Sequence, residues 1–165
     1  MAGVELSPTL VDETLAAFVT QRVSIIAASR DRANVPSLTR VIGCRVADDR
    51  RTVTVFVDAA QAGALLADVM AAGVIAVVFS QPSTHRTFQL KGVDAARVPV
   101  SDADRECIAR YADMMVEEIL QIGHPEAFTR AMLAGAPADV VAIAFTPCAA
   151  FDQTPGPRAG ARLGS

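Results

Sequence analysis

Strand-like segments joined by short polar turns constrain the fold of this chain more than any other feature. Residues 23–29 form a β-branched apolar run, and residues 52–57 alternate between hydroxyl-bearing and apolar side chains. Residues 74–80 are apolar up to Ser80, and residues 86–93 alternate again after a turn at residues 81–84. Alternation with a period of two is typical of half-buried strands, and short turns favour antiparallel pairing. The sequence therefore predicts an antiparallel β-sheet protein.

The remaining segments complete the order of helices and strands. Residues 36–46 are predicted to return antiparallel to the first strand, so that the first three strands form a meander. Residues 140–151 regain strand character, and the segment after them has the Pro-Gly-Pro sequence and low apolar content of an irregular tail. Asp58 is the expected cap of the helix at residues 58–72. Ser101 and Asp104 are expected to form a capping box at the start of the helix at residues 101–122. Helical spacing and capping signals predict four helices, at residues 8–20, 58–72, 101–122 and 126–133.

The fold class that follows is mainly β, of the α+β type. A twisted sheet of six or more strands usually closes into a barrel, because closure removes its unpaired edges. We therefore predict a small antiparallel β-barrel with peripheral helices. With 165 residues, the chain is the size of one ordinary domain. Residues 1–151 are predicted to form this single domain, and residues 152–165 a C-terminal tail.

Charge and composition narrow the classes of function. The formal net charge is −3, so no overall positive field attracts nucleic acid or an anionic membrane. The N-terminus lacks the pattern of a secretory signal, and the longest uncharged apolar run, of 11 residues, is too short to span a membrane. We expect a cytoplasmic protein that binds neither nucleic acids nor membranes. Apolar residues make up 52% of the chain, which favours an oligomer with an apolar interface.

The spacing of the reactive side chains matches no common catalytic or metal-binding motif. The three cysteines are far apart in sequence and fit neither a disulfide framework nor a metal-ligand pair. His85 and His124 lie in or beside turns, with no second ligand at metal-binding spacing. Glu117 and Glu118 are interpreted as part of the solvated face of a predicted helix. We predict no metal site, and no side chain stands out as a catalytic acid, base or nucleophile.

The central part of the chain nevertheless resembles one protein family. Residues 36–41 (Pro-Ser-Leu-Thr-Arg-Val) are followed by an acidic turn and by residues 54–58 (Thr-Val-Phe-Val-Asp). A helix, an apolar strand and residues 85–92 (His-Arg-Thr-Phe-Gln-Leu-Lys-Gly) come next. In this order the segments resemble the pyridoxamine 5′-phosphate oxidase-like, FMN-binding split β-barrel superfamily. The ending, residues 151–157, is similar to that of poorly characterised bacterial members.

This resemblance implies a split-barrel homodimer with two FMN sites at the subunit interface. It also implies an oxidoreductase activity, in which the flavin accepts a hydride from a small organic substrate or a nicotinamide donor. Arg40 would meet the FMN phosphate, and the backbone of Phe56 and Val57 would lie beside the isoalloxazine ring. Thr87 and Gln89 would reach polar atoms of the ring. The full set of cofactor-binding residues that the resemblance implies is Thr39, Arg40, Val41, Phe56, Val57, Thr87, Gln89 and Lys91.

The sequence departs from the family pattern just before the predicted helix at residues 58–72. The resemblance implies a pair of Arg or Lys residues there for the FMN phosphate, but residues 58–63 are Asp-Ala-Ala-Gln-Ala-Gly. No Lys or Arg occurs between Arg51 and Arg86. The alternative hypothesis is therefore a dimeric split barrel that has lost FMN. Such a barrel would bind another small ligand, for example haem or a deazaflavin, or a protein partner.

Overall fold

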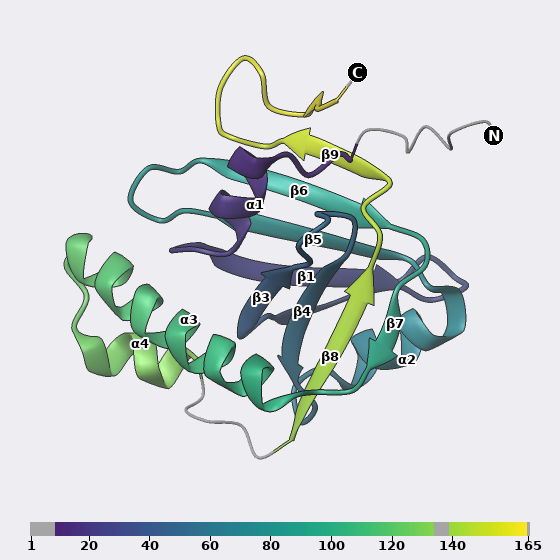
Figure 1. Ribbon diagram of the computed structural model, residues 1–165, viewed down its shortest axis with the longest axis horizontal. Coiled ribbons are helices and arrows are strands. Elements are labelled where there is room, and N and C mark those ends of the chain that lie inside the picture. The colour runs from purple at the N-terminus through teal and green to yellow at the C-terminus, as the bar shows by residue number, and fades with distance from the viewer. Residues whose placement is uncertain (1–8, 134–138, 165) are drawn as a thin grey trace.

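The computed structural model describes residues 9–133 and 139–164 (Figure 1). Its helices are α1 (Glu13–Val19), α2 (Gly63–Ala72), α3 (Asp102–Gln121) and α4 (Glu126–Met132). Its strands are β1 (Ser24–Arg30), β2 (Pro36–Arg40), β3 (Gly43–Val46), β4 (Val53–Asp58), β5 (Ile75–Ser80), β6 (Thr87–Gly92), β7 (Ala96–Val98), β8 (Val140–Phe145), β9 (Ala149–Asp152) and β10 (Ala161–Arg162). Within the described residues these strands form two antiparallel sheets. One has the order β10-β9-β6-β5-β1-β2, and the other has the order β3-β4-β8-β7.

The two sheets pack face to face around one main core. In Figure 1 the strands of the six-stranded sheet cross β4 and β8 at a steep angle. Phe79 from β5 and Phe145 from β8 are almost fully buried between the sheets. The sheets do not join into one closed cylinder, so the architecture is a split barrel. The predicted class, mainly β with peripheral helices and six or more strands, is confirmed.

The chain passes from one sheet to the other at Val41 and Ile42. The Val41 N–H donates to the Ile25 carbonyl of the six-stranded sheet at 3.0 Å. The next N–H, of Ile42, donates to the Phe56 carbonyl of the four-stranded sheet at 2.8 Å. The prediction of one strand over residues 36–46 is therefore wrong, because its two halves pair in different sheets. The predicted three-stranded meander is wrong for the same reason.

A second crossing divides the strand predicted over residues 140–151. β8 pairs with β4 and β7 in the four-stranded sheet, whereas β9 pairs with β6 in the six-stranded sheet. Between them, the Cys148 N–H donates to the Lys91 carbonyl at 2.8 Å and begins the second pairing. The tail predicted to be irregular is in part a strand, since β10 pairs antiparallel with β9.

Side-chain caps fix the beginnings of two helices. Ser101 Oγ accepts from the Asp104 N–H at 3.1 Å and Asp104 Oδ2 accepts from the Ser101 N–H at 3.0 Å, which confirms the predicted capping box of α3. Arg45 Nε donates to the same carboxylate at 2.6 Å. Burial by itself raises the pKa of Asp104, but these bonds bring it below its usual value, so the carboxylate is charged at neutral pH. The α1 helix is capped by Asp12 and begins at Glu13. The predicted start of this helix at residue 8 is therefore wrong, because the described residues 9–12 are not helical; the Ser7-Pro8 signal itself lies outside the described residues.

Gly92 lies at the end of β6, directly against the ring of Phe145. A Cβ atom at this position would be 2.6 Å from Phe145 Cδ2 and 3.1 Å from its Cβ. Gly92→Ala is therefore expected to lower the free energy of unfolding by roughly 1–3 kcal/mol, the usual cost of overpacking a core. Gly63→Ala, where a Cβ meets nothing within 4 Å, is the matched control and should be neutral or stabilising. Urea denaturation measures both, and equal stability of the two variants would contradict the tight contact.

Candidate functional site

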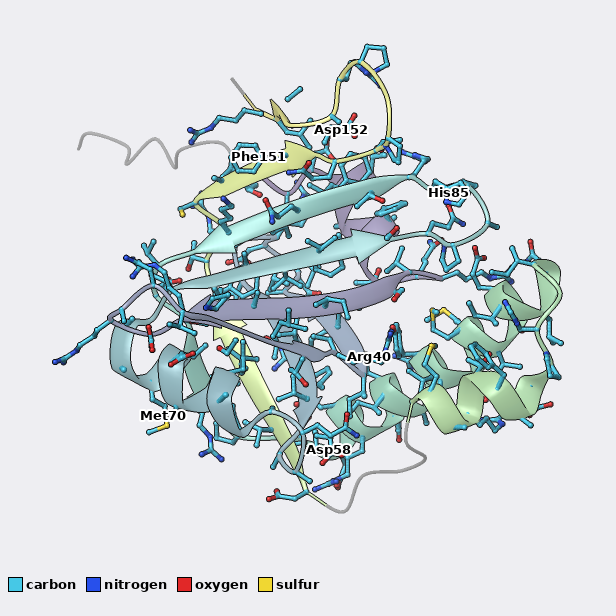
Figure 2. All side chains as sticks on the ribbon, turned by 180° about the vertical axis from the view of Figure 1, so that it is seen from behind. Arg40, Asp58, Met70, His85, Phe151 and Asp152 are labelled. Atoms are coloured by element: carbon cyan, nitrogen blue, oxygen red, sulfur yellow. The ribbon has the colours of Figure 1, made fainter. Side chains whose placement is uncertain are left out.

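One face of the six-stranded sheet is open, and the candidate site lies on it (Figure 2). Seen from this side, no described helix crosses β1, β5 or β6, and α2 and α3 flank the sheet. The registers fix which side chains share the face: Ile26 opposes Arg40 and Val78, and Val78 opposes Gln89. Opposed residues of paired strands point to the same side of a sheet. We call this surface the outer face; its strand residues are Ser24, Ile26, Ala28, Arg30, Pro36, Leu38, Arg40, Ala76, Val78, Ser80, Thr87, Gln89, Lys91, Ala149, Phe151 and Arg162.

Four of the predicted site residues belong to the outer face: Arg40, Thr87, Gln89 and Lys91. Arg40 lies on β2, at the edge of the sheet next to α3 (Figure 2), and the other three lie on β6. Three strand spacings separate β2 from β6, which corresponds to roughly 14 Å. The structure therefore brings these four residues to one surface. Arg40 lies toward one edge of that surface, and the three residues of β6 lie toward the other. The side chains of Ile26 and Val78 form the apolar centre between them.

The other four predicted residues point into the protein. Thr39 is 6% exposed on the inner side of β2, and Val41, Phe56 and Val57 are fully buried. Phe56 packs in a small cluster with Ile42 and Ala142, on the side of the four-stranded sheet that α3 covers. These side chains are core, and any contribution to a ligand on the outer face is limited to their backbone. Thr39 and Arg40 illustrate the rule that neighbours along a strand face opposite sides.

Arg40 carries a positive charge that no described carboxylate neutralises. Its Nη1 donates to Ser24 Oγ at 3.1 Å, and it forms no ion pair with the residues that the structure describes. The positive charge of Arg40 also acts on the hydroxyl group of Tyr111 in α3. Burial raises the pKa of Tyr111, and Arg40 offsets part of that rise. The Tyr111 hydroxyl itself donates to the Val23 carbonyl at 2.9 Å, so it supports the sheet rather than a ligand.

The charged side chains of the outer face all have the same sign. Its ionisable side chains on the described strands are all basic, namely Arg30, Arg40, Lys91 and Arg162. Lys91 Nζ lies 5.2 Å from the centre of the Phe151 ring, which shows on the same face in Figure 2. Because the whole chain carries a net charge of −3, this local excess of cations is not a consequence of composition. The face is suited to an anionic ligand.

Sequence reasoning missed a row of hydroxyl groups on the outer face. Ser24, Ser80 and Thr87 oppose one another on β1, β5 and β6, and Ser80 Oγ lies 2.8 Å from Thr87 Oγ1. With Arg40 bonded to Ser24, the row provides polar groups along one end of the apolar centre. Each hydroxyl lies at one end of its strand: Ser24 begins β1, Ser80 ends β5 and Thr87 begins β6. Pairing between distant segments is what aligns them, so a single sequence window contains no signal for the row.

The segment before α2 offers no cation to a ligand. α2 begins at Gly63 and not at Asp58, because the Asp58 carbonyl accepts from the Gln61 and Ala62 N–H groups in a preceding turn. Asp58 is therefore not the helix cap. Its carboxylate lies at the end of β4 (Figure 2), where Oδ1 accepts from the Ala60 N–H at 3.0 Å. The structure thus places a carboxylate, and no basic side chain, at the turn before this helix.

The remaining acidic candidates have structural contacts. Glu117 pairs with Arg22 at 2.5 Å on the surface. The interpretation of Glu118 as solvated is wrong, because its side chain is buried and its Oε1 accepts from the Ser83 N–H at 2.8 Å. Within the part of the chain that the structure describes, no three His, Cys, Asp or Glu side chains come together as a possible metal site. No helix in that part is long and apolar enough to cross a membrane.

Comparison with known proteins supports the fold. No family model matches the chain, and no curated protein matches it. The solved structure of HupZ from Group A Streptococcus is 14% identical with a TM-score of 0.54, over 90% of this chain and 98% of that chain. A pyridoxamine 5′-phosphate oxidase-related, FMN-binding protein from Nostoc punctiforme is 16% identical with a TM-score of 0.50, over 94% of this chain and 89% of that chain.

Similarity at this level of identity concerns the fold, and it extends over most of each chain. This similarity of fold agrees with the resemblance drawn from the strands and helix over residues 36–92, and with the two separate sheets of the structure. The chain therefore shares the overall fold of these two solved structures, which in this chain is a split β-barrel of two antiparallel sheets.

Proposed function

We propose that this chain binds FMN on the outer face, as one subunit of a homodimer, and acts as a flavin-dependent oxidoreductase. The observation that carries the proposal is the composition of that face. An apolar centre of Ile26 and Val78 lies between Arg40 on one side and Thr87 and Gln89 on the other. A planar ring needs apolar surface with a few polar groups to orient it, and a phosphate needs a cation. A fold neighbour named as FMN-binding supports the same assignment.

The residues of the outer face fit the parts of FMN. Arg40 would hold the phosphate, because its charge is unpaired among the described residues and its planar fork suits a phosphate oxygen pair. Thr87 and Gln89 would donate to or accept from the ring, and Lys91 adds positive charge on the same strand. When bound, the flavin supplies the redox chemistry by accepting a hydride from a small organic or nicotinamide donor. The chain's own residues bind and orient the ring, and no side chain is assigned as an acid or base.

The partner in this proposal is a second copy of the chain. Leu38 is 67% exposed on the outer face, beside Ala28 and Ala76 of the neighbouring strands. An open apolar sheet face that continues into a ligand site is typical of an interface. A second copy would cover both Leu38 and the bound ring. Size-exclusion chromatography with light scattering should therefore give twice 17.3 kDa, and a monomer at micromolar concentration would contradict the proposal.

Arg40→Ala should weaken FMN binding without unfolding the protein. The loss of a charge-assisted contact to phosphate is expected to cost about 1.5–3 kcal/mol of binding free energy, or roughly 10- to 150-fold in Kd. Titration of the protein into FMN, followed by quenching of flavin fluorescence, measures this change. Arg105→Ala, which removes an exposed arginine on α3, is the matched control and should leave the affinity unchanged. An unchanged affinity in folded Arg40→Ala would remove Arg40 from the site.

One observation favours a second candidate function. The turn before α2 carries the Asp58 carboxylate and no basic residue, so the phosphate would have Arg40 but no second cation from this segment. A dimeric split barrel that binds another planar ligand, such as haem or a deazaflavin, would not need that cation pair. The visible absorption spectrum of the purified protein separates the candidates. Flavin bands or saturable binding of FMN support the first, and a Soret band or indifference to FMN supports the second.

A further inference from the structure

Two adjoining pockets lie between α1 and the beginning of β6, on the side of the six-stranded sheet opposite the outer face (Figure 1). They have volumes of about 220 and 330 Å³ and share Thr14, Phe18 and Arg86 in their lining. We call the larger one the α1 pocket. Its apolar lining residues are Leu10, Leu15, Phe18, Phe88 and Leu163. Nothing in the proposed flavin function uses this pocket.

Arg86 lies against two aromatic rings of this lining. Its guanidinium carbon is 5.2 Å from the centre of the Phe18 ring and 5.6 Å from the centre of the Phe88 ring. The two rings meet edge to face, with 4.9 Å between their centres. Attraction between a cation and aromatic rings restrains the guanidinium, and its N–H groups stay available as donors. Because Arg86 is exposed and lines both pockets, these donors are accessible to a bound molecule.

The positive charge of Arg86 has no acceptor at hydrogen-bond distance. Among the residues that the structure describes, its guanidinium forms neither an ion pair nor a hydrogen bond. Asp152 is influenced by Arg86 only from a distance. Hydrogen bonds from Thr154 hold the pKa of Asp152 below its usual value, and the charges of Arg158 and Arg86 add to this effect. The Asp152 carboxylate is thus already engaged, since its Oδ1 accepts from the Thr154 N–H at 2.9 Å.

The described lining of the α1 pocket contains one carboxylate, and it lies away from Arg86. This carboxylate belongs to Asp12, the cap of α1, whose Oδ1 accepts from the Leu15 N–H at 2.8 Å. Asp12 and Phe18, the helix residue beside Arg86, are six positions apart in sequence, which corresponds to roughly 9 Å along a helix. The pocket therefore has an acidic end at Asp12, an apolar middle and a cationic end at Arg86.

We infer that the α1 pocket binds a small apolar carboxylic acid, with the carboxylate on Arg86 and the hydrocarbon body against Leu15, Phe88 and Leu163. The paired N–H donors of a guanidinium match the two oxygens of a carboxylate. A volume of about 330 Å³ suits a body of one or two rings, and the aromatic lining favours ring contacts. One cation, with the Asp12 carboxylate at the other end, favours a monoanion over a phosphate. The pocket lies across the sheet from the outer face, so its test does not depend on FMN binding.

NMR titration of the wild-type chain with sodium benzoate, at constant ionic strength in chloride, tests the pocket. Benzoate should shift the ring resonances of Phe18 and Phe88 in a saturable way. Benzyl alcohol keeps the ring without the charge, and acetate keeps the charge without the ring. Each should bind at least about tenfold more weakly than benzoate. Absence of benzoate binding, or equal binding of either comparison compound, would overturn the inference.

Arg86→Gln removes the charge and keeps a polar side chain, and it should weaken benzoate binding about tenfold or more. Arg105→Gln, at an exposed arginine on α3, is the matched control and should bind benzoate like wild type. A folded Arg86→Gln protein with the affinity of wild type would show that the carboxylate does not lie on Arg86, and the inference would be wrong.

A measurement without variants covers the case in which Arg86→Gln does not fold. In the wild-type chain, nuclear Overhauser contacts should connect the benzoate ring protons with the Phe88 ring and the Leu163 methyl groups. Benzoate held only adventitiously by surface arginines would give no contacts with these two residues. That result would overturn the inference even if benzoate binds.

Discussion

Phe79→Ala is expected to lower the free energy of unfolding by about 3–5 kcal/mol. Phe79 is fully buried on β5, and its register partners Ile25 and Phe88 lie on the same inner side of the six-stranded sheet. Truncation would remove a ring from the layer between the two sheets, where neither sheet can move to fill the space. Because small proteins are stable by only about 5–15 kcal/mol, this loss is a large part of the total.

Urea denaturation followed by circular dichroism measures the effect of Phe79→Ala. Phe128→Ala is the matched control, because the Phe128 ring on α4 is 47% exposed and its loss should change stability by less than about 1 kcal/mol. If both variants lose the same small amount, Phe79 is not at the centre of the core and the proposed packing of the two sheets is wrong.

Phe56→Ala is the second change with a large expected effect, again about 3–5 kcal/mol of unfolding free energy. Phe56 is fully buried in the second hydrophobic cluster, packed with Ile42, Ala142 and Ile108 of α3. The family resemblance places the backbone of this residue beside the flavin ring, whereas its side chain holds α3 against the four-stranded sheet. The variant therefore tests whether the residue acts through packing or through a ligand.

Phe56→Leu separates the two roles. Leucine retains most of the buried apolar volume, so this variant should remain folded with a loss clearly smaller than that of Phe56→Ala. Its affinity for FMN, measured by flavin fluorescence, should equal that of wild type because the side chain does not reach the outer face. A folded Phe56→Leu protein that binds FMN much more weakly would contradict the assignment of Phe56 to the core.

Patterns among residues close together in the sequence were sufficient to predict some helices and strands. The alternation in residues 86–93 correctly gives β6 and its antiparallel pairing with β5. The Ser101 and Asp104 pair correctly gives the start of α3, because a capping box depends on residues three apart in sequence. Helical spacing alone is misleading for Met70: it lies four residues after the buried Leu66 of α2, but it is 70% exposed and points away from the sheet (Figure 2).

The candidate site was predictable in part, and the limit has a physical cause. Alternation assigns Arg40 and Thr39 to opposite sides of β2, but it does not say which side faces the core. The resemblance gave the strands of the site, and the registers then divided its residues into four on the outer face and four in the interior. The row of hydroxyl groups forms only when β1, β5 and β6 are paired, because the pairing places Ser24, Ser80 and Thr87 opposite one another.

Sequence patterns alone were enough for the four helices, for most of the strands, for the class of fold, and for the pairing of β5 with β6 across a short turn. Each of these depends on side chains close together in the chain. The tertiary structure alone decided where a strand leaves one sheet for the other, at Val41–Ile42 and between β8 and β9. It also decided that Glu118 is buried and that one face of the six-stranded sheet stays open. These features depend on hydrogen bonds and packing between residues far apart in sequence, which local periodicity does not record.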